Sequence, residues 1–487
     1  MNPAEPVADI LERCPEYAAT SHIDALRATE YRRLDEGHHV YLDYTGGGLY
    51  ADSQLRRHVA LLEGVVLGNP HSASRTSMGT TALVERTRRA VLDWFNAAGH
   101  YTAIFTMNAT GALKLVGEAY PFGPGTHFLM TADNHNSVNG IREFARGRGA
   151  EVAYAPLTFP ELRIDVATLD TLLGRGTAPG LFAFPAQSNF SGVLHPLDLV
   201  GRAKARGWDV LLDAAAFVPT HRLDLGEVRP DFVCVSFYKM FGYPTGVGCL
   251  LVHDDALARL ARPWFAGGTV NFATVHGLAH ILAPREAGFE DGTLNYLSIP
   301  AVEIGLQHLA SVGIDLIETR VRCLTGWLLE ELVALRHSNG RPMARIYGPL
   351  TTVMRGGIVT MNFYDPDGHL LDYRRVEELA GLSGISLRTG CFCNPGPGET
   401  AESITDEDVA AALAMAPELT LPRFVQVITD RGGRSAGAIR VSFGIASNAD
   451  DARRFLTFAA GLRDQTRLTM GDVTFDIESC RVIRDGS

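Results

Sequence analysis

The chain has 487 residues, of which 46% are hydrophobic and 20% are charged, so it has the composition of a globular protein and the length for two domains. Its formal net charge of -11, without a basic cluster, argues against a surface that binds nucleic acid. It has no apolar run near the roughly 20 residues of a membrane-spanning helix, and its first residues show no signal-peptide pattern. The seven cysteines are an odd number. We therefore predict a cytoplasmic protein with reduced thiols and with neither a membrane nor a nucleic acid as partner.

Short apolar runs alternate with amphipathic stretches between residues 101 and 252. Helices are predicted at residues 110–118 and near residues 138–146. Strands are predicted at residues 102–106, 127–131, 151–155, 180–184, 208–213, 231–237 and 247–252. Because strands that alternate with helices form crossover connections, this region predicts an α/β fold with a mostly parallel central sheet.

The second half of the chain indicates a smaller unit of helices and strands. Residues 299–335 have the pattern of long helices, which would lead into this unit. The other predicted elements are strands at residues 357–363 and 438–443, a loop at the glycine-rich residues 431–437, and a covering helix at residues 450–462. A further strand-like stretch at residues 473–476 has no predicted place.

Lys239 lies two positions after the strand predicted at residues 231–237, where an amine is costly to bury unless it has a task. One such task is Schiff-base formation with an aldehyde such as pyridoxal phosphate, whereas a lone lysine here would more often be a surface residue. Asp213 ends the strand at residues 208–213. A carboxylate there suits a ring nitrogen that must stay protonated, although it could also cap a helix. The 26 positions between the two residues allow one crossover and the next strand, so the pair favours the cofactor.

Other polar residues follow neighbouring strands, at the sheet edge where ligands bind in open parallel sheets. Thr110 and Gly111 open a predicted helix, whose backbone N–H groups could hold a phosphate, although a simple helix cap is as plausible. Ser236 could donate to the same phosphate or bond to nearby backbone.

Three further residues could face the ring of such a cofactor. The imidazole of His135 could stack on the ring and exchange protons at neutral pH, although a lone histidine in a loop is more often without such a role. Gln187 and Asn189 follow the strand at residues 180–184, and the amide of either could hydrogen-bond a phenolic oxygen.

A glycine- and proline-rich loop at residues 388–396 contains an arginine and two cysteines. Arg388 offers a two-pronged donor suited to an amino-acid carboxylate. Cys391 and Cys393 lie where an exposed thiolate would be useful. The pair could be half of a metal site, but no second cysteine or histidine pair has suitable spacing, so we predict no metal.

Together these residues resemble a known family, the fold-type I, class V pyridoxal phosphate enzymes, and within it the cysteine desulfurases. The sequence is most similar to the sulfurase domain of molybdenum cofactor sulfurases. Matching segments run in family order at residues 41–46, 69–72, 134–137, 187–192, 236–246, 289–295 and 388–396.

The resemblance implies a fold-type I transferase in three parts. Residues 1–40 would be an N-terminal segment packed on the small domain, and residues 41–300 would be the large domain that binds the cofactor. Residues 301–487 would be a smaller α+β domain that carries the arginine and cysteine loop.

The resemblance also implies which residues surround the cofactor, pyridoxal 5′-phosphate. Lys239 would hold the cofactor as a Schiff base and act in catalysis. Asp213 would pair with the ring nitrogen, His135 would stack on the ring and move protons, and Asn189 would support the ring oxygen.

The phosphate would be shared between two subunits, because members of this family are homodimers with shared sites. The residues implied for it are Thr110, Gly111 and Ser236 of one subunit, and Thr269 or Thr293 of its neighbour.

The implied activity is that of a cysteine desulfurase-like carbon–sulfur lyase, which converts L-cysteine to L-alanine. Arg388 and Tyr44 would bind the substrate, and Cys393 would take the sulfur as a persulfide and pass it to an acceptor protein or small molecule. The sequence differs from many desulfurases at residues 44–48 and at Ala216, where relatives have a glutamine near the cofactor oxygen. Two alternatives are therefore kept: a pyridoxal phosphate enzyme that acts on another amino acid by beta-elimination, decarboxylation or other biosynthetic chemistry without sulfur transfer, and a dimeric scaffold without activity.

Overall fold

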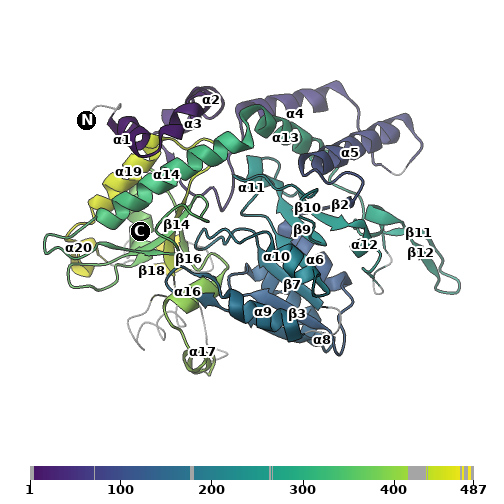
Figure 1. Ribbon diagram of the computed structural model, residues 1–487. Coiled ribbons are helices and arrows are strands. Elements are labelled where there is room, and N and C mark those ends of the chain that lie inside the picture. Colours follow the sequence, from purple (N-terminus) through teal and green to yellow (C-terminus); the bar gives the residue numbers. More distant parts are fainter. Residues whose placement is uncertain are drawn as a thin grey trace.

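The structure is a computed structural model that describes residues 5–70, 72–175, 180–262, 265, 267–414, 435, 437–471, 474–476 and 481–483. Two larger sheets organise the described residues, one of seven strands and one of four (Figure 1). The N-terminal helices lie beside the part that contains the four-stranded sheet, whereas a hairpin projects from the other end of the molecule (Figure 1).

The seven-stranded sheet is parallel except for one strand. Strand β10 runs antiparallel to both of its neighbours, whereas the other paired strands are parallel. The strand order is β2 (Tyr101–Thr106), β10 (Gly248–His253), β9 (Phe232–Ser236), β8 (Trp208–Asp213), β7 (Gly180–Pro185), β3 (His127–Thr131) and β4 (Glu151–Ala155). This confirms the predicted mostly parallel sheet. The reversed direction of β10 could not be predicted, because an apolar run does not encode strand direction.

Both faces of this sheet are covered, which explains why its strands are apolar throughout. On β7, Leu181 and Ala183 belong to one core, and Phe182 and Phe184 belong to the other, as the alternation of side chains along a strand requires. The helices around the sheet are α4 (Asp52–Gly64), α5 (Arg75–Trp94), α6 (Ala109–Ala119), α7 (Asn136–Asn139), α8 (Ile141–Gly147), α9 (Val166–Arg175), α10 (Leu199–Lys204), α11 (Phe237–Phe241), α12 (Asp254–Leu257) and α13 (Pro300–Val312). The single helix predicted near residues 138–146 is thus two short helices.

The four-stranded sheet is antiparallel. Its order is β13 (Ala344–Tyr347), β14 (Ile358–Phe363), β17 (Ala438–Ser442) and β16 (Arg388–Gly390). The helices of this part are α14 (Ile314–Ala334), α15 (Tyr373–Leu382), α16 (Pro395–Ala401), α17 (Asp406–Leu413), α19 (Ala449–Ala460) and α20 (Arg467–Met470). Gly313, with a φ of 92°, separates α13 from α14, because a residue in this conformation cannot continue a helix.

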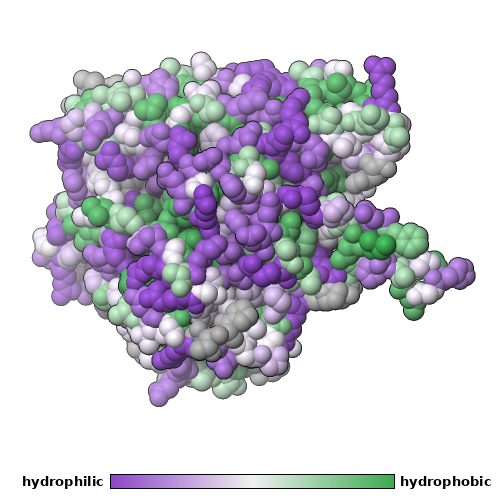
Figure 2. Space-filling model, turned by 45° about the vertical axis from the view of Figure 1, so that its right-hand side comes forward, coloured by the Kyte–Doolittle hydropathy of each residue, from purple (hydrophilic) through white to green (hydrophobic). Residues whose placement is uncertain are grey.

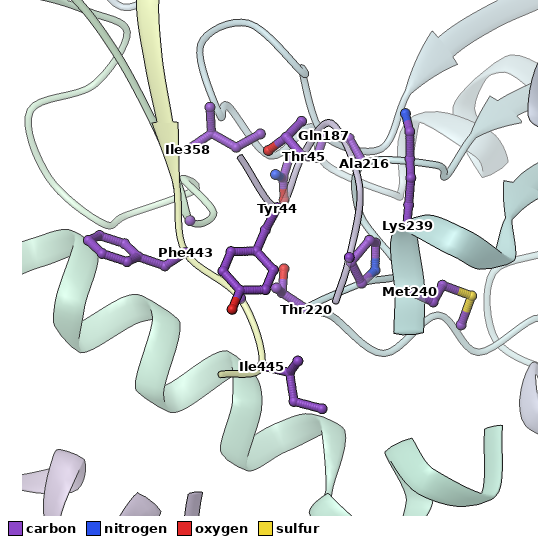
Figure 3. Close-up of a pocket in the computed structure, with 14 residues that line it drawn as sticks. Tyr44, Thr45, Gln187, Ala216, Thr220, Lys239, Met240, Ile358, Phe443 and Ile445 are labelled. Carbon is purple, nitrogen blue, oxygen red and sulfur yellow. The ribbon is translucent and has the colours of Figure 1, made fainter. Parts of the chain in front are cut away.

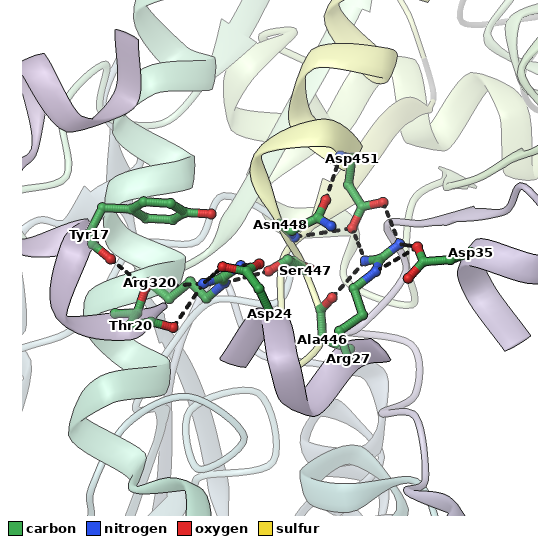
Figure 4. A network of polar contacts seen from close by, with 10 residues as sticks. All are labelled: Tyr17, Thr20, Asp24, Arg27, Asp35, Arg320, Ala446, Ser447, Asn448 and Asp451. Atoms are coloured by element: carbon green, nitrogen blue, oxygen red, sulfur yellow. Dashed lines mark hydrogen bonds and ion pairs between the residues drawn. The ribbon is translucent and has the colours of Figure 1, made fainter. Parts of the chain in front are cut away.

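Two buried arginines attach the N-terminal helices to the C-terminal part (Figure 4). Arg27 donates to both carboxylate oxygens of Asp451 on α19, at 2.5 and 3.1 Å. Arg320 on α14 pairs with Asp24 and donates to the carbonyl oxygen of Ser447 at 2.7 Å. The N-terminal elements are α1 (Glu5–Arg13), the 3-10 helix η1 (Pro15–Thr20), α2 (His22–Glu30) and α3 (Arg33–Glu36).

A disulfide joins Cys14 to Cys323 on α14, with 5.7 Å between their Cα atoms. The prediction of reduced thiols is therefore wrong for this pair. The two cysteines are separated by 309 positions, and the packing of η1 on α14 brings them together, which a cysteine count cannot reveal. The other described cysteines are free.

Short strands complete the fold. Strand β1 (Val40–Tyr41) pairs with β15 (Ile385–Ser386), so the start of the segment predicted as the large domain contacts the C-terminal part. The division into residues 1–40, 41–300 and 301–487 stays a prediction. The remaining elements are β5 (Leu157–Thr158), β6 (Arg163–Ile164), β11 (Val270–Ala273), β12 (His280–Leu282), η2 (Arg285–Gly288), β18 (Thr474–Asp476) and β19 (Arg481–Ile483).

Two predicted stretches fall partly outside the described residues. The glycine-rich loop at residues 431–437 is described only at Ser435 and Gly437, and the strand-like stretch at residues 473–476 is described as β18 without Val473. Among the helices that the structure describes, none has the length and hydropathy to cross a bilayer.

Candidate active site

A cavity of about 130 Å³ lies at the carboxyl ends of β7, β8 and β9, the sheet edge where ligands bind in open parallel sheets. Seven residues that we considered for catalysis or cofactor binding line this lysine cavity, namely Thr110, His135, Gln187, Asn189, Asp213, Ser236 and Lys239. Gly111 follows Thr110 on the first turn of α6. The structure therefore brings together residues that the sequence places after separate strands.

Lys239 lies on α11, the short helix that directly follows β9. Asp213 ends the neighbouring strand β8, and its Oδ1 accepts hydrogen bonds from the Ala215 N–H at 3.0 Å and the Cys234 thiol at 3.4 Å. Desolvation by burial lowers the pKa of Lys239, and the Asp213 carboxylate opposes that shift. The amine therefore stays neutral, and hence nucleophilic, to a lower pH than an exposed lysine.

His135 caps the short helix α7. Its Nδ1 accepts a hydrogen bond from the Ser137 N–H at 3.1 Å, so the proton of the neutral ring lies on Nε2. Burial lowers the pKa of His135, with Asp213 opposing the shift, so the site favours the neutral form of the ring. A neutral ring in the wall of the cavity can both stack on a flat ligand and exchange protons.

The start of α6 forms an anion-binding corner of the cavity. Asn108 caps this helix by accepting the Gly111 N–H at 3.0 Å, and Ser236 Oγ accepts the Ala109 N–H at 2.8 Å. The hydroxyls of Thr110 and Ser137 are 2.7 Å apart. Hydroxyls beside the positive end of an 11-residue helix suit a phosphate.

Asn189 joins the cavity to the cysteine loop at residues 388–396. Its Nδ2 donates to the carbonyl oxygen of Phe392 at 2.9 Å, and its Oδ1 accepts from Nδ2 of Asn394 at 2.8 Å. Asn394 also donates to the carbonyl oxygen of Asp133 at 2.7 Å. The Asn189 side chain thus holds the loop in place, besides lining the cavity.

The backbone of the cysteine loop contacts the start of α7, next to His135. The N–H of Asn136 donates to the carbonyl oxygen of Cys393 at 2.7 Å. Phe392 and Cys393 have φ values of 56° and 53°, a left-handed conformation that costs energy for residues other than glycine. Such strain is common at functional loops, where contacts like those of Asn189 and Asn394 maintain it.

Arg388, on β16, is paired with a carboxylate of this chain. Its Nε and Nη2 donate to Oδ2 of Asp43 at 3.0 and 2.6 Å. The other oxygen of Asp43 accepts from Nη2 of Arg440 at 3.0 Å, and Arg440 is buried. Nη1 of Arg388 makes no hydrogen bond with any residue that the structure describes, and the side chain is half-exposed, so it remains open to a substrate carboxylate.

A second, smaller cavity of about 20 Å³ shares lining residues with the first, and Figure 3 shows the residues that line it. Gln187, Ala216 and Lys239 line both cavities. Tyr44, which we predicted to contact the substrate, lines only the smaller one and is buried.

The structure does not bring Thr269 or Thr293 to this cavity. Thr269 is buried in its own subunit, whereas Thr293 is exposed and its Oγ1 accepts from Nδ2 of Asn69 at 3.4 Å.

Sequence reasoning missed three residues that organise the site, namely Asp43, Asn394 and Arg440. Asp43 and Asn394 do lie inside the matching segments at residues 41–46 and 388–396, which was a signal for them. Arg440 had no such signal, because its role follows from burial beside Asp43.

The residues present fit pyridoxal phosphate. Lys239 has a lowered pKa beside Asp213, and the hydroxyl-lined start of α6 suits the phosphate. Gln187 also lines the cavity, and its Nε2 donates to no residue that the structure describes, so this amide can donate to a ligand.

The family model "Aminotransferase class-V" matches residues 40–455. Molybdenum cofactor sulfurases from Arabidopsis thaliana and Solanum lycopersicum are 38% and 37% identical, over 90% of this chain and 58% and 57% of their own lengths. The cysteine desulfurase of Thermococcus onnurineus has a TM-score of 0.73 at 21% identity, over 90% of this chain and 97% of that one. This likeness confirms the predicted fold.

Proposed function

Because the chain belongs to the class V aminotransferase family, and is accordingly a pyridoxal phosphate-dependent enzyme, we propose that it is a cysteine desulfurase-like carbon–sulfur lyase. It converts L-cysteine to L-alanine and leaves the sulfur as a persulfide on Cys393. The observation that carries this proposal is the hydrogen bond from the Asn136 N–H to the Cys393 carbonyl oxygen, which holds the thiol-bearing residue against the wall of the lysine cavity.

Residues at the carboxyl edge of the seven-stranded sheet carry out the chemistry at the substrate α-carbon. Bound on Lys239, pyridoxal phosphate supplies an electron sink for that carbon. Asp213 holds a proton at the ring nitrogen, which keeps the sink effective. Lys239, displaced by the substrate amine, takes the α-proton, because its lowered pKa keeps it neutral.

The sulfur is then taken by the cysteine loop. The Cys393 thiolate attacks the substrate sulfur, so an S–S bond forms while the bond from that sulfur to the β-carbon breaks. The electron pair returns to the β-carbon, which is protonated to give alanine. Arg388 holds the substrate carboxylate through its open Nη1 edge.

This function can be tested with purified protein, pyridoxal phosphate, L-cysteine and a thiol reductant. We expect alanine and sulfide in equal amounts. If neither product forms from L-cysteine while another amino acid is consumed without sulfide, the sulfur-transfer proposal is contradicted and the alternative substrate class is supported.

We also propose that the enzyme is a homodimer, on the strength of the hairpin that projects from the large sheet. Figure 2 shows hydrophobic side chains along this arm, where Val275 and Leu278 are 88% and 89% exposed, and Phe272 and Ile281 more than half. Monomers rarely expose such a cluster. The partner's phosphate would be bound by Thr269, whose buried Oγ1 has no partner among the described residues, or by the exposed Thr293.

The dimer can be tested by sedimentation. The mass expected is twice 52.7 kDa, and Val275→Asp with Leu278→Asp should yield the monomer. A wild-type monomer at micromolar concentration would contradict the proposal.

The persulfide acceptor is proposed to approach from solvent, because Cys393 is exposed whereas Cys391 is half-buried. We propose the cytoplasm as the compartment, since Cys393 must be kept as a thiol between turnovers, whereas the burial of Cys323 shields the Cys14–Cys323 disulfide from cytoplasmic thiols.

A further inference from the structure

We propose that the amide of Gln187 hydrogen-bonds the phenolic oxygen of the coenzyme held on Lys239. This inference rests on the proposed function only in that Lys239 carries pyridoxal phosphate. It assigns to Gln187 the role that resemblance gives to Asn189, and four observations support it.

The first observation is where Gln187 lies. It follows β7 at the carboxyl edge of the large sheet and is 3% exposed. With Lys239 and Ala216 it lines both the lysine cavity and the smaller cavity beside it (Figure 3). Its side chain therefore faces the same space as the amine that carries the coenzyme.

The second observation is its unused hydrogen-bonding capacity. Among the residues that line the lysine cavity, Gln187 alone has a buried side-chain polar atom without a partner, its Oε1. Its Nε2 makes no hydrogen bond with any residue that the structure describes. Unlike Oε1, Nε2 is not among the fully buried atoms, so this N–H donor is the end of the amide that a ligand acceptor in the cavity could bind.

The third observation is the contrast with Asn189, two positions further along the same loop. The Nδ2 and Oδ1 of Asn189 are already bonded to Phe392 and Asn394. The amide of Asn189 would have to break these hydrogen bonds with the cysteine loop to bind the coenzyme. The amide of Gln187 makes no hydrogen bond with any described residue and would have none to break.

The fourth observation concerns the room around the amide. A Cβ atom placed on Gly356 would lie 2.3 Å from Oε1 of Gln187 and 3.1 Å from Nε2, so the glycine leaves space for this side chain. Oε1 packs closely against Gly356 and is fully buried. Nε2 is therefore the polar atom of this amide that can face a ligand in the cavities. An N–H donor there suits a phenolic oxygen, whereas the methyl group of Ala216 offers no hydrogen bond.

A donor to the phenolic oxygen has a measurable consequence. That oxygen carries more negative charge when the nitrogen joining the coenzyme to Lys239 is unprotonated, so the donor favours the unprotonated state. Removing the donor should therefore raise the pH midpoint of the visible absorbance change of the holoenzyme. One hydrogen bond corresponds to a shift of about half to one pH unit.

The experiment compares three variants by absorbance between pH 5 and 10 and by thermal unfolding without coenzyme. Gln187→Met should raise the midpoint without lowering the Tm of the apoprotein, because the lost amide has no partner in it. Gly356→Ala displaces the amide and should raise the midpoint in the same direction. Gln54→Met is the matched control, since the buried amide of Gln54 is bonded to Ala51 and Phe241, and this change should lower the Tm and leave the midpoint unchanged.

The outcomes separate this inference from the proposed function. An unchanged midpoint in both Gln187→Met and Gly356→Ala, with borohydride still fixing the coenzyme on Lys239, would overturn the role of Gln187 alone. A fall in apoprotein Tm equal to that of Gln54→Met would make the residue structural and also overturn it. If wild-type protein shows no coenzyme on Lys239, the proposed function itself fails. Should Gln187→Met not fold, Gly356→Ala decides the matter by the same midpoint.

Discussion

The lysine cavity and the cysteine loop are built in opposite ways. Lys239 and Asp213 lie at or directly after the ends of buried strands, in a wall fixed by the core of the large sheet. Cys393 is exposed on a loop with a left-handed backbone, which side chains such as Asn189 hold at a few points. Proton transfer at a substrate carbon requires groups held in fixed positions, whereas sulfur transfer to an acceptor requires an accessible thiol on a loop that can move. Changes in the cavity should therefore abolish coenzyme attachment, and changes in the loop should spare it.

The largest effect is expected from Lys239→Ala, which removes the cavity's nucleophile. Turnover should fall by at least about 10³-fold, and the visible band of the coenzyme should be lost. The chain has only three lysines, so Lys114→Ala on the exposed face of α6 is a clean control. A variant that keeps the covalent coenzyme would contradict the assignment.

Cys393→Ser should separate the two regions. We expect sulfide formation to fall by about 10²- to 10³-fold while the visible band is unchanged, because the thiol takes no part in holding the coenzyme. Cys391→Ser is the matched control and should stay within about twofold of wild type. Equal losses in the two variants would mean that both thiols share the transfer.

Arg388→Gln tests whether the arginine at the start of the cysteine loop binds the substrate carboxylate. The KM for L-cysteine should rise by about 10- to 100-fold, because the loss of a charge-assisted hydrogen bond weakens binding by about that factor. The change in kcat should be smaller. Steady-state kinetics would show this, with the exposed Arg146→Gln as control. A fall in kcat at constant KM would argue against carboxylate binding by Arg388.

The Cys14–Cys323 disulfide allows a test of the N-terminal segment, which continues along the chain to Asp43. Reduction should lower the free energy of unfolding by about 2–5 kcal/mol, because the bond closes a very long loop. Chemical denaturation with and without reductant measures this, and Cys323→Ser should not respond to reductant. A wild-type protein equally stable in both conditions would contradict the expectation.

The smallest effect concerns pH. The protonated amine of Lys239 cannot attack an aldehyde, so the rate of coenzyme uptake by the apoprotein should fall as pH drops through the lysine pKa. Burial lowers that pKa, so the fall should occur below the range of an exposed lysine. Asp213→Asn removes the charge that opposes this shift, so the fall in uptake rate should occur at still lower pH. At neutral pH the rate of coenzyme uptake should then be a few-fold higher than in wild type. A shift to higher pH in this variant, seen by stopped-flow absorbance, would contradict the account.

The parts of the fold that could be predicted are those set by local pattern. Strands β3, β4 and β8 have the predicted bounds, because buried apolar runs and the residues that end them are visible in the sequence. The same rule placed Asp213 and Lys239, since functional groups after parallel strands meet at one edge.

What could not be predicted depends on contacts between distant segments. Cys14 meets Cys323 only after η1 packs on α14, and Asp43 meets Arg388 and Arg440 only after the N-terminal segment reaches the small sheet. The difference between Asn189 and Gln187 is of this kind as well, because two amides in one motif differ only in which neighbours their atoms find.

The central claim is that the cavity releases sulfur and one residue of the loop takes it. Its most direct test is peptide mass spectrometry of the holoenzyme after one exposure to L-cysteine without reductant. We predict a gain of about 32 Da, one sulfur atom, on the peptide at Cys393, and no gain in Lys239→Ala. Alanine formation with no added sulfur at Cys393, or with the sulfur at Cys391 alone, would contradict it.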